Sequence, residues 1–443
     1  MVAILLPVAA LFLSFGILLA GNGLQGTLLP VRAGLEGFTP FAIGAMGAAF
    51  YVGYILTCFC APWIVARAGH IRSFTVFGTV ASAAQLMHVV WLDEFSWSVL
   101  RFITGACLCG LYMVMESWIN ERSSQEHRGR ILSVYQIVNL GAVTAGQLML
   151  NLYDPAGFQL FVIGSVLVSI SLVPVALTRT VAPQPLQKVR IRISRVFGIS
   201  PVGVISCLTV GLVNGAIWTI VPLYAQNTLN SIAELSLFMS LIIIGGAAFQ
   251  WPLGRWSDII DRRWVIIFIC VGAGVGALAL MLLGSLSREV MFALAFVYGG
   301  FAFSLYAIAI AHANDQADPE DFVEIASTLI LVFAVGAVIG PLIASAAVQW
   351  LGPDTFFAYS AAIHFLTAGF AFFRMHMRPA TAAEDKEDFI AVPRASPEVI
   401  NIDPRSGDDD PEAQDEADGE SAEDDTTDRP EEAPGDGGKG GKA

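Results

Sequence analysis

Apolar residues fall into twelve long runs along the chain, and clusters of Arg, Asp, Pro or Gly separate one run from the next. A helix that crosses a bilayer needs about 20 mainly apolar residues, because lipid offers no hydrogen-bond partner to an open backbone group. The pattern therefore predicts twelve membrane-spanning helices. Their expected ranges are 5–29, 40–66, 73–92, 98–119, 130–152, 157–178, 200–225, 233–257, 264–284, 289–313, 324–350 and 355–377.

The composition supports a membrane protein, with 55% hydrophobic residues, 14% charged residues and a mean hydropathy of +0.65. The formal net charge of −14 comes from one region. Residues 379–443 contain 21 acidic and 6 basic residues, whereas the rest of the chain contains 17 acidic and 18 basic residues. A nearly neutral body gives no indication of a nucleic-acid partner, and we expect the lipid bilayer as its surroundings.

Lys and Arg are distributed unequally between the two sets of loops. If the N-terminus is inside the cell, the inner joints and the exit from the last span carry 15 of these residues. The outer face then carries three, Arg32, Arg101 and Arg288. Cytoplasmic loops carry the excess of positive charge in membrane proteins. We therefore expect both termini to be cytoplasmic.

The two halves of the chain repeat a set of residues at a constant spacing. A shift of 192 residues places Asn22, Gly23, Thr27 and Pro30 on Asn214, Gly215, Thr219 and Pro222. A shift of 194 residues places eight residues of spans four and five on residues of spans ten and eleven, including Tyr112 on Tyr306. An even number of spans in each repeat keeps both the same way up. The predicted fold is therefore an all-α membrane protein with two parallel six-helix repeats.

The predicted domains follow from this repeat. They are an N-terminal six-helix half at 1–178, a basic cytoplasmic linker at 179–199, a C-terminal six-helix half at 200–378 and a tail at 379–443. The tail is acidic, rich in Pro and Gly and poor in aromatic residues, which is typical of disordered segments. Two roles are open for the tail. One is solvation or spacing, and the other is the binding of a basic cytoplasmic partner.

The segment GRWSDIIDRR (Gly254 to Arg263) lies between expected spans eight and nine. With this segment and the duplicated twelve-span pattern, the chain resembles the major facilitator superfamily over almost all of its length before the tail. The resemblance implies a loop that closes the cytoplasmic side when the site faces outward. Its gate residues here would be Gly254, Asp258, Arg262 and Arg263. A carboxylate at a helix N-terminus stabilises by up to about 1 kcal/mol, which is enough to bias two states of similar energy.

The corresponding loop of the first half, APWIVARAGHIRSF, departs from this pattern, because Ala66 or Ala68 stands where the aspartate is expected. The two gates are therefore expected to differ. Gly336-x-x-x-Gly340-Pro341 resembles the antiporter element of the superfamily. It lies on span eleven rather than span five, so it does not support antiport, and small residues that permit close helix packing are the favoured interpretation.

Two related stretches, ESWIN at the inner end of span four and AHAND at the inner end of span ten, resemble a poorly characterised bacterial subgroup of facilitator-type transporters. This resemblance implies a multi-pass protein of the bacterial plasma (inner) membrane and assigns no substrate. For the oligomeric state we expect a monomer.

Glu116 lies within about one turn of the inner end of span four. Three roles are open: a gate residue that pairs with an arginine, a protonatable coupling site, and a direct ligand contact. Its depth favours the gate residue, because a charge near a span end costs much less than one at the bilayer centre. The candidate partners are Arg67, Arg122, Arg128 and Arg130.

His312 and Asp315 occupy the equivalent joint of the second half. The acidic loop that begins at Asp315 is expected to meet the basic loops of the first half, while Asp318 and Pro319 resemble the start of a capped helix. His312 is either a histidine that titrates near neutral pH or, more commonly, an interfacial histidine with satisfied hydrogen bonds.

The superfamily places spans one, four, seven and ten around a central cavity, so polar residues near the middle of these spans are candidate substrate-binding residues. Amides this deep need partners, which a ligand or a neighbouring helix supplies. Arg101 near the outer end of span four either extends to the interface or attracts an anionic substrate. The candidate residues are Asn22, Gln25, Arg101, Tyr112, Asn214, Trp218 and Tyr306.

No Gly-x-x-x-x-Gly-Lys-Ser/Thr segment occurs in the sequence, and no arrangement of residues suggests an enzyme, a metal site or a cofactor. The sequence predicts a secondary active transporter that moves a small organic solute by alternating access, with proton coupling as an option. The expected solute is neutral or weakly charged and partly apolar. The alternative is a transporter-like receptor or scaffold that signals through its acidic tail.

Overall fold

The computed structural model describes residues 9–123, 127–177, 186, 191–317, 321–377, 386 and 389–402. Within these residues, twelve helices are long and apolar enough to cross a membrane, as predicted. The first half contains α2 (Ala9–Leu35), α3 (Pro40–Ala68), α4 (His70–Val90), α5 (Glu94–Glu121), α6 (Arg128–Leu148) with η3 (Met149–Leu152), and α7 (Gln159–Leu177). The second half contains α9 (Pro201–Thr228), α10 (Ile232–Ile259), α11 (Arg262–Leu283), α12 (Arg288–Asn314), α13 (Phe322–Leu351) and α14 (Thr355–Met375). Two short helices, α8 (Ile193–Ile199) and η6 (Pro397–Ile402), lie outside the spans.

Polar caps and prolines fix where several helices begin. The Thr39 hydroxyl accepts a hydrogen bond from the Ala42 amide at 3.2 Å, and Pro40 occupies the first position of α3. Ser200 and Pro201 begin α9 in the same way. A hydroxyl acceptor satisfies an amide that has no partner within the helix, and proline lacks the amide altogether. These starts lie close to the predicted ones.

The first helix extends further than predicted, because α2 ends at Leu35 rather than at residue 29. Pro30 lies inside the helix, which is tolerated in membrane helices. Arg32 forms an ion pair with Glu36 at 2.7 Å and donates a hydrogen bond to the Pro155 carbonyl at 3.1 Å. The charge that marked the expected end of the span is therefore satisfied within the last turns of the helix. Residues 5–8 of the predicted span lie outside the described residues.

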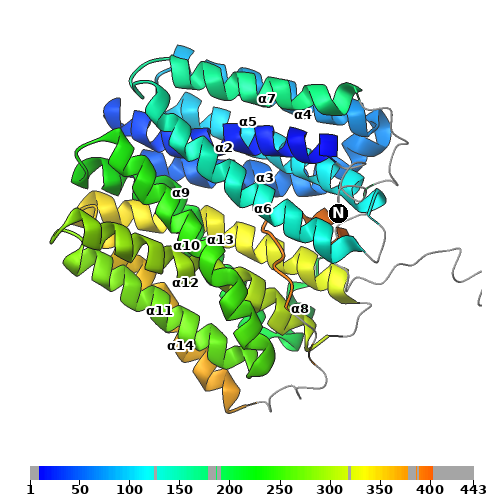
Figure 1. Ribbon diagram of the computed structural model, residues 1–443, viewed down its shortest axis with the longest axis vertical. Coiled ribbons are helices and arrows are strands. Elements are labelled where there is room, and N and C mark those ends of the chain that lie inside the picture. Colours follow the sequence, from blue (N-terminus) through cyan, green and yellow to red (C-terminus); the bar gives the residue numbers. More distant parts are fainter. Residues whose placement is uncertain are drawn as a thin grey trace, which may run out of the picture. The chain divides into compact units, whose positions relative to one another are not determined.

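The same helix pairings occur in both halves. In the first half α2 packs against α6 and α7, α3 against α5, and α4 against α5 and α7. In the second half α9 packs against α13 and α14, α10 against α12, and α11 against α12 and α14. Figure 1 shows the first half in blue to cyan and the second half in green to orange. This correspondence confirms the predicted fold of two parallel six-helix repeats.

The two halves contact each other through α3 and α13, α2 and α9, and α6 and α10. We call the end of the bundle that contains residues 254–262 the gate end and the other the opposite end. Two hydrogen bonds link the halves at the opposite end. The Phe41 amide donates to the Gln349 side chain at 3.2 Å, and the Asn151 amide group donates to the Ser236 hydroxyl at 2.7 Å.

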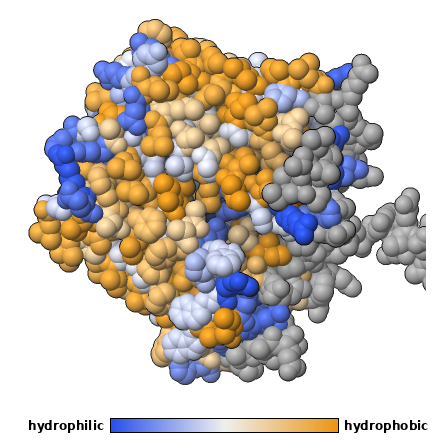
Figure 2. All heavy atoms as spheres, in the orientation of Figure 1, coloured by the Kyte–Doolittle hydropathy of each residue, from blue (hydrophilic) through white to orange (hydrophobic). Residues whose placement is uncertain are grey.

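Hydrophobic side chains cover most of the face shown in Figure 2, and hydrophilic residues gather toward the two ends of the helices. Among the exposed hydrophobic side chains are Trp63 (66%), Ile137 (71%) and Leu366 (70%). An exposed apolar surface of this kind is typical of a protein surrounded by lipid.

The linker docks on the start of α13. Arg195 of α8 forms ion pairs with Asp321 at 2.8 Å and with Glu324 at 3.2 Å. The sequence predicts that the acidic loop before α13 meets basic loops of the first half, and this prediction is wrong for Asp321, which pairs with the linker. The reason is proximity, since α8 places a base beside the first turn of α13. The expected cap at Asp318 and Pro319 lies outside the described residues.

Candidate functional site: a cavity between the halves and a charged gate

A cavity of about 190 Å³ lies between the two halves. Its walls come from α2, α3, α5 and α6 of the first half, from α9, α10, α12 and α13 of the second, and from residues 392–394. Five amide side chains and four tyrosines supply most of its polar groups. They are Asn22, Gln136, Asn139, Asn214 and Gln250, and Tyr51, Tyr54, Tyr112 and Tyr306.

Six of the seven candidate substrate-binding residues line this cavity: Asn22, Arg101, Tyr112, Asn214, Trp218 and Tyr306. Asn22 with Asn214 and Tyr112 with Tyr306 are pairs related by the repeat. Both polar atoms of the Asn214 side chain lack a hydrogen-bond partner among the described residues. The seventh candidate, Gln25, is buried on α2 at 6% exposure and is not among the lining residues.

Arg101 lies at the cavity rather than reaching for the membrane interface. Its guanidinium carbon is 4.3 Å from the centre of the Phe50 ring, and the residue is among those that line the cavity. A cation over an aromatic face is attracted by the ring quadrupole. This position is compatible with contact between the guanidinium and a substrate in the cavity.

Several lining residues were missed from the sequence, because they lie on spans two, five, eight and eleven. The Gln136 side chain on α6 donates to the Gln250 side chain on α10 at 3.2 Å, which joins the two halves across the cavity. Tyr51 and Tyr54 extend from α3, and Phe333 comes from α13. The superfamily resemblance places other spans around the cavity, and the scattered polar and aromatic residues of these four spans do not indicate which helix side faces inward.

Glu116 is fully buried on α5, at 0% exposure. The Tyr135 hydroxyl donates to its Oε1 atom at 2.5 Å, and the Ser396 hydroxyl donates to its Oε2 atom. None of the four expected arginines is among its hydrogen-bond partners in the described part of the chain. The predicted pairing with an arginine is therefore wrong, because α6 and a segment after the last span supply the partners instead. The segment after the last span was predicted to be part of a disordered tail.

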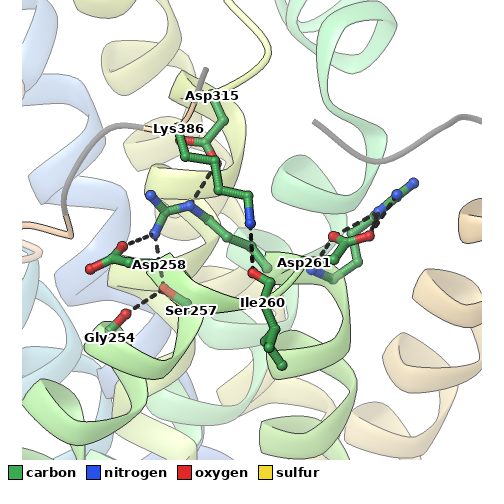
Figure 3. Close-up of polar contacts among 9 residues, drawn as sticks. Gly254, Ser257, Asp258, Ile260, Asp261, Asp315 and Lys386 are labelled. Atoms are coloured by element: carbon green, nitrogen blue, oxygen red, sulfur yellow. Dashed lines mark hydrogen bonds and ion pairs between the residues drawn. The ribbon is translucent and has the colours of Figure 1, made fainter. Parts of the chain in front are cut away.

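A second polar cluster lies at the gate end, where α10 turns into α11 (Figure 3). The Arg262 side chain is 1% exposed and bonds two carboxylates. It contacts Asp258 of α10 at 3.0 Å and Asp315, at the end of α12, at 2.6 Å. It also donates to the Ser257 hydroxyl at 2.9 Å. Three of the predicted gate residues are thus in direct contact, and they join α10, α11 and α12.

The other predicted gate residues surround this cluster. Arg263 is 2.7 Å from Asp261, the residue that caps α11. Burial by itself raises the pKa of the Asp261 carboxyl, but the hydrogen bonds and charge of Arg263 outweigh it and hold that pKa below its usual value. His312 is buried in the last turn of α12, at 4% exposure. Gly254 packs so closely against Phe389 that an added Cβ would lie 2.1 Å from the ring.

Residues 389–402 form a segment that we call the strap, and it lies between the two halves, drawn in orange in Figure 1. Lys386, just before it, donates to the Ile260 carbonyl at 2.7 Å. The strap itself accepts a hydrogen bond at the Ala395 carbonyl from the Tyr54 hydroxyl of α3, and its helix η6 packs against α5 and α13. Ala395, Ser396 and Ile402 are at most 1% exposed.

The strap belongs to the range 379–443 that the sequence predicted as a disordered tail, so this part of the range differs from the prediction. The difference has a physical cause, because the strap is mainly apolar and finds partners on both halves. Residues 403–443 lie outside the described residues.

No group of three or more His, Cys, Asp or Glu side chains in the described ranges is arranged to hold a metal ion. The six cysteines are free thiols.

Comparison with known proteins gives a consistent family. The family model described as Major Facilitator Superfamily matches residues 11–230 and 203–404. A relative in Escherichia fergusonii, named uncharacterized MFS-type transporter YcaD, is 22% identical over 365 residues, which cover 81% of this chain and 94% of the relative. The relative of the same name in Salmonella newport is 24% identical over 367 residues, with the same coverage.

Solved structures share the fold. The nucleoside transporter NupG superposes with a TM-score of 0.66 at 13% identity and covers 84% of this chain and 99% of its own. A bacterial homologue of the human lysosomal transporter Spinster, in an inward-facing and occupied conformation, gives 0.69 at 11% identity and covers 86% and 97%. The predicted family and its poorly characterised bacterial subgroup are thereby confirmed. With twelve membrane-spanning helices and family matches in both halves, this chain belongs to the major facilitator superfamily.

Proposed function

We propose that the protein is a secondary active transporter that moves a small organic solute across the bacterial plasma membrane. The observation that carries the proposal is the cavity, because repeat-related residues of both halves face it in pairs. Alternating access by rocking of two repeats requires a site at the repeat interface. Asn22 with Asn214 and Tyr112 with Tyr306 occupy such a site.

The remaining parts of the proposal concern orientation and coupling. We place both termini and the gate end in the cytoplasm, with the protein acting as a monomer. Arg262, Asp258 and Asp315 then hold the cytoplasmic ends of α10, α11 and α12 together while the halves move. Glu116 is the candidate proton carrier, since its carboxyl is fully buried and a buried charge without a cation is costly.

The test is flux into proteoliposomes of a solute chosen by thermal-shift screening of the purified protein. We expect Asp258→Asn to lose most of the flux while it still binds the solute, and removal of residues 403–443 to leave the flux unchanged. An imposed pH gradient should increase accumulation in the wild type and not in Glu116→Gln. Flux that survives Asp258→Asn but disappears with the tail would favour the receptor or scaffold instead.

A further inference from the structure

Two guanidinium groups line the cavity, one from a membrane-spanning helix and one from the strap. Arg101 belongs to α5 and lies over the Phe50 ring at 4.3 Å. Arg394 belongs to the strap and lies over the rings of Phe303 at 4.8 Å and Phe333 at 5.9 Å. Both residues are among those that line the cavity. In the described part of the chain neither guanidinium donates a hydrogen bond, so their N–H groups remain available to a ligand in the cavity that both residues line.

The cavity offers these cations no counter-charge of its own. Among the described lining residues there is no aspartate and no glutamate. A charge held at membrane depth without a partner is costly, and arginines in such positions usually mark a substrate or ion pathway. Tyrosine hydroxyls and amides nearby supply further donors, including Tyr51 and Asn214.

The apolar part of the lining limits what else the ligand contains. Phe50, Trp218, Phe303 and Phe333 place aromatic faces around the polar groups. Such a wall suits a ring or another apolar body, whereas the two guanidinium groups suit a carboxylate or a phosphate, which arginine binds in a bidentate manner. The combination therefore fits an amphipathic anion better than a neutral solute.

We propose that the cavity binds a small organic anion, with its carboxylate or phosphate between Arg101 and Arg394 and its apolar part against the aromatic wall. The proposal rests on the proposed transport function, and it narrows the neutral or weakly charged, partly apolar solute expected from sequence to an anion. Arg394 takes part because the residues that follow it are held in place on both halves. The Tyr54 hydroxyl and the Glu116 carboxylate of the first half bond the Ala395 carbonyl and the Ser396 hydroxyl, and η6 packs against α13 of the second half.

The test is binding to the purified full-length protein, measured by thermal shift and by titration calorimetry. Four probes share one ring and differ in charge: benzoate, phenyl phosphate, benzamide and benzylamine. We expect benzoate or phenyl phosphate to raise the melting temperature, and the stronger of the two identifies the anionic group. Benzamide should act weakly, and benzylamine should not act.

The variants Arg101→Gln and Arg394→Gln should each weaken binding of the favoured anion at least ten-fold. Arg101→Lys keeps a cation and should lose less, which guards against a simple folding defect in the glutamine variant. The matched control is Arg255→Gln, because Arg255 also lies over an aromatic ring, Trp251 at 5.1 Å, but is exposed and does not line the cavity. It should change the affinity less than two-fold.

Three results would overturn the proposal. The first is a melting-temperature shift with benzylamine or benzamide and none with either anion, and the second is no shift with any probe. The third is tighter binding in Arg394→Gln, because Arg394 would then be an occupant that a ligand must displace. Anion binding that is accompanied by no flux in proteoliposomes supports the anion site and counts against the transport function alone.

Discussion

The loops after α3 and after α10 occupy equivalent places in the two repeats, yet they are held together by different means. His70 begins α4 as Arg262 begins α11, and both side chains are buried. His70 contacts only the Ser117 hydroxyl at 3.3 Å among the hydrogen bonds of the described residues, whereas Arg262 bonds two carboxylates.

The caps of the two helices differ as well. Asp261 caps α11 with its side chain, while Gly69 precedes α4 without a side-chain hydrogen bond and with a φ of 83°. The first-half loop is therefore fixed by backbone conformation and packing, and the second-half loop by charge. Movements that separate these helix ends should depend more strongly on electrostatics in the second half than in the first.

The largest difference in stability between the two loops is expected when Arg262 is removed. Arg262→Met removes the cation that bonds the Asp315 carboxylate, whose side chain is 2% exposed, and breaking such a buried pair costs about 3–5 kcal/mol. The measurement is the loss of unfolding free energy, or of melting temperature, in detergent. Arg67→Met in the first-half loop removes an exposed arginine that lies over Trp63 at 5.8 Å, and should cost at most about 1 kcal/mol. Equal losses in both variants would show that charge does not distinguish the loops.

An intermediate effect is expected from the glycines. Gly69→Ala places a side chain on a backbone with φ 83° and ψ 158°, which should cost about 1–3 kcal/mol although nothing lies within 4 Å of the new Cβ. Gly254→Ala instead meets the Phe389 ring. Adding Phe389→Ala should therefore rescue the melting temperature of Gly254→Ala and leave that of Gly69→Ala unchanged. Rescue of both, or of neither, would contradict this distinction.

The smallest effect concerns pH. The pKa of Asp261 is held below its usual value in the folded protein, so the ionised carboxylate stabilises the fold. This contribution to the free energy of unfolding is fully present above the ordinary aspartate pKa of about 3.9. It is lost as pH falls through the lower pKa of the folded state. Asp261→Asn should cost about 1 kcal/mol or less at pH 7 and reduce the loss of stability on acidification. Melting temperatures between pH 7 and pH 3 measure this. Gly69→Asn, which adds no titrating group to the first-half cap, should leave the pH dependence unchanged.

Sequence patterns predict the fold well because each span must be apolar along nearly all of its length, so the spans are visible without any contact information. The repeat then adds the cavity residues that occur twice. Asn22 led to Asn214, and Tyr112 to Tyr306, because both members of each pair have the same type and spacing.

Cavity-lining residues that have no counterpart in the other repeat were not found in this way. Tyr51, Gln136 and Gln250 face the cavity only because of how their helices are rotated, and scattered polar residues in a mainly apolar run do not report rotation. The partners of Glu116 were missed for a related reason, because Ser396 lies 280 positions away in the sequence.

Arg394 was hidden by the composition of its surroundings. The strap, FIAVPRASPEVINI, contains one acid and one base and is mainly apolar, but it lies within a range whose total composition is acidic. When composition is calculated over a stretch shorter than the whole tail, the apolar strap is distinguished from the acidic residues around it. Composition averaged over 65 residues concealed a segment that is able to fold against the bundle.

The place of the strap after the last span also sets an order of assembly. Translation proceeds from the N-terminus, so all twelve helices leave the ribosome before residues 389–402 do. The helices that line the cavity therefore emerge before residues 392–394, which complete its lining. Polypeptides released by a premature stop after residue 377 would keep the helical part of the lining and lack Arg394.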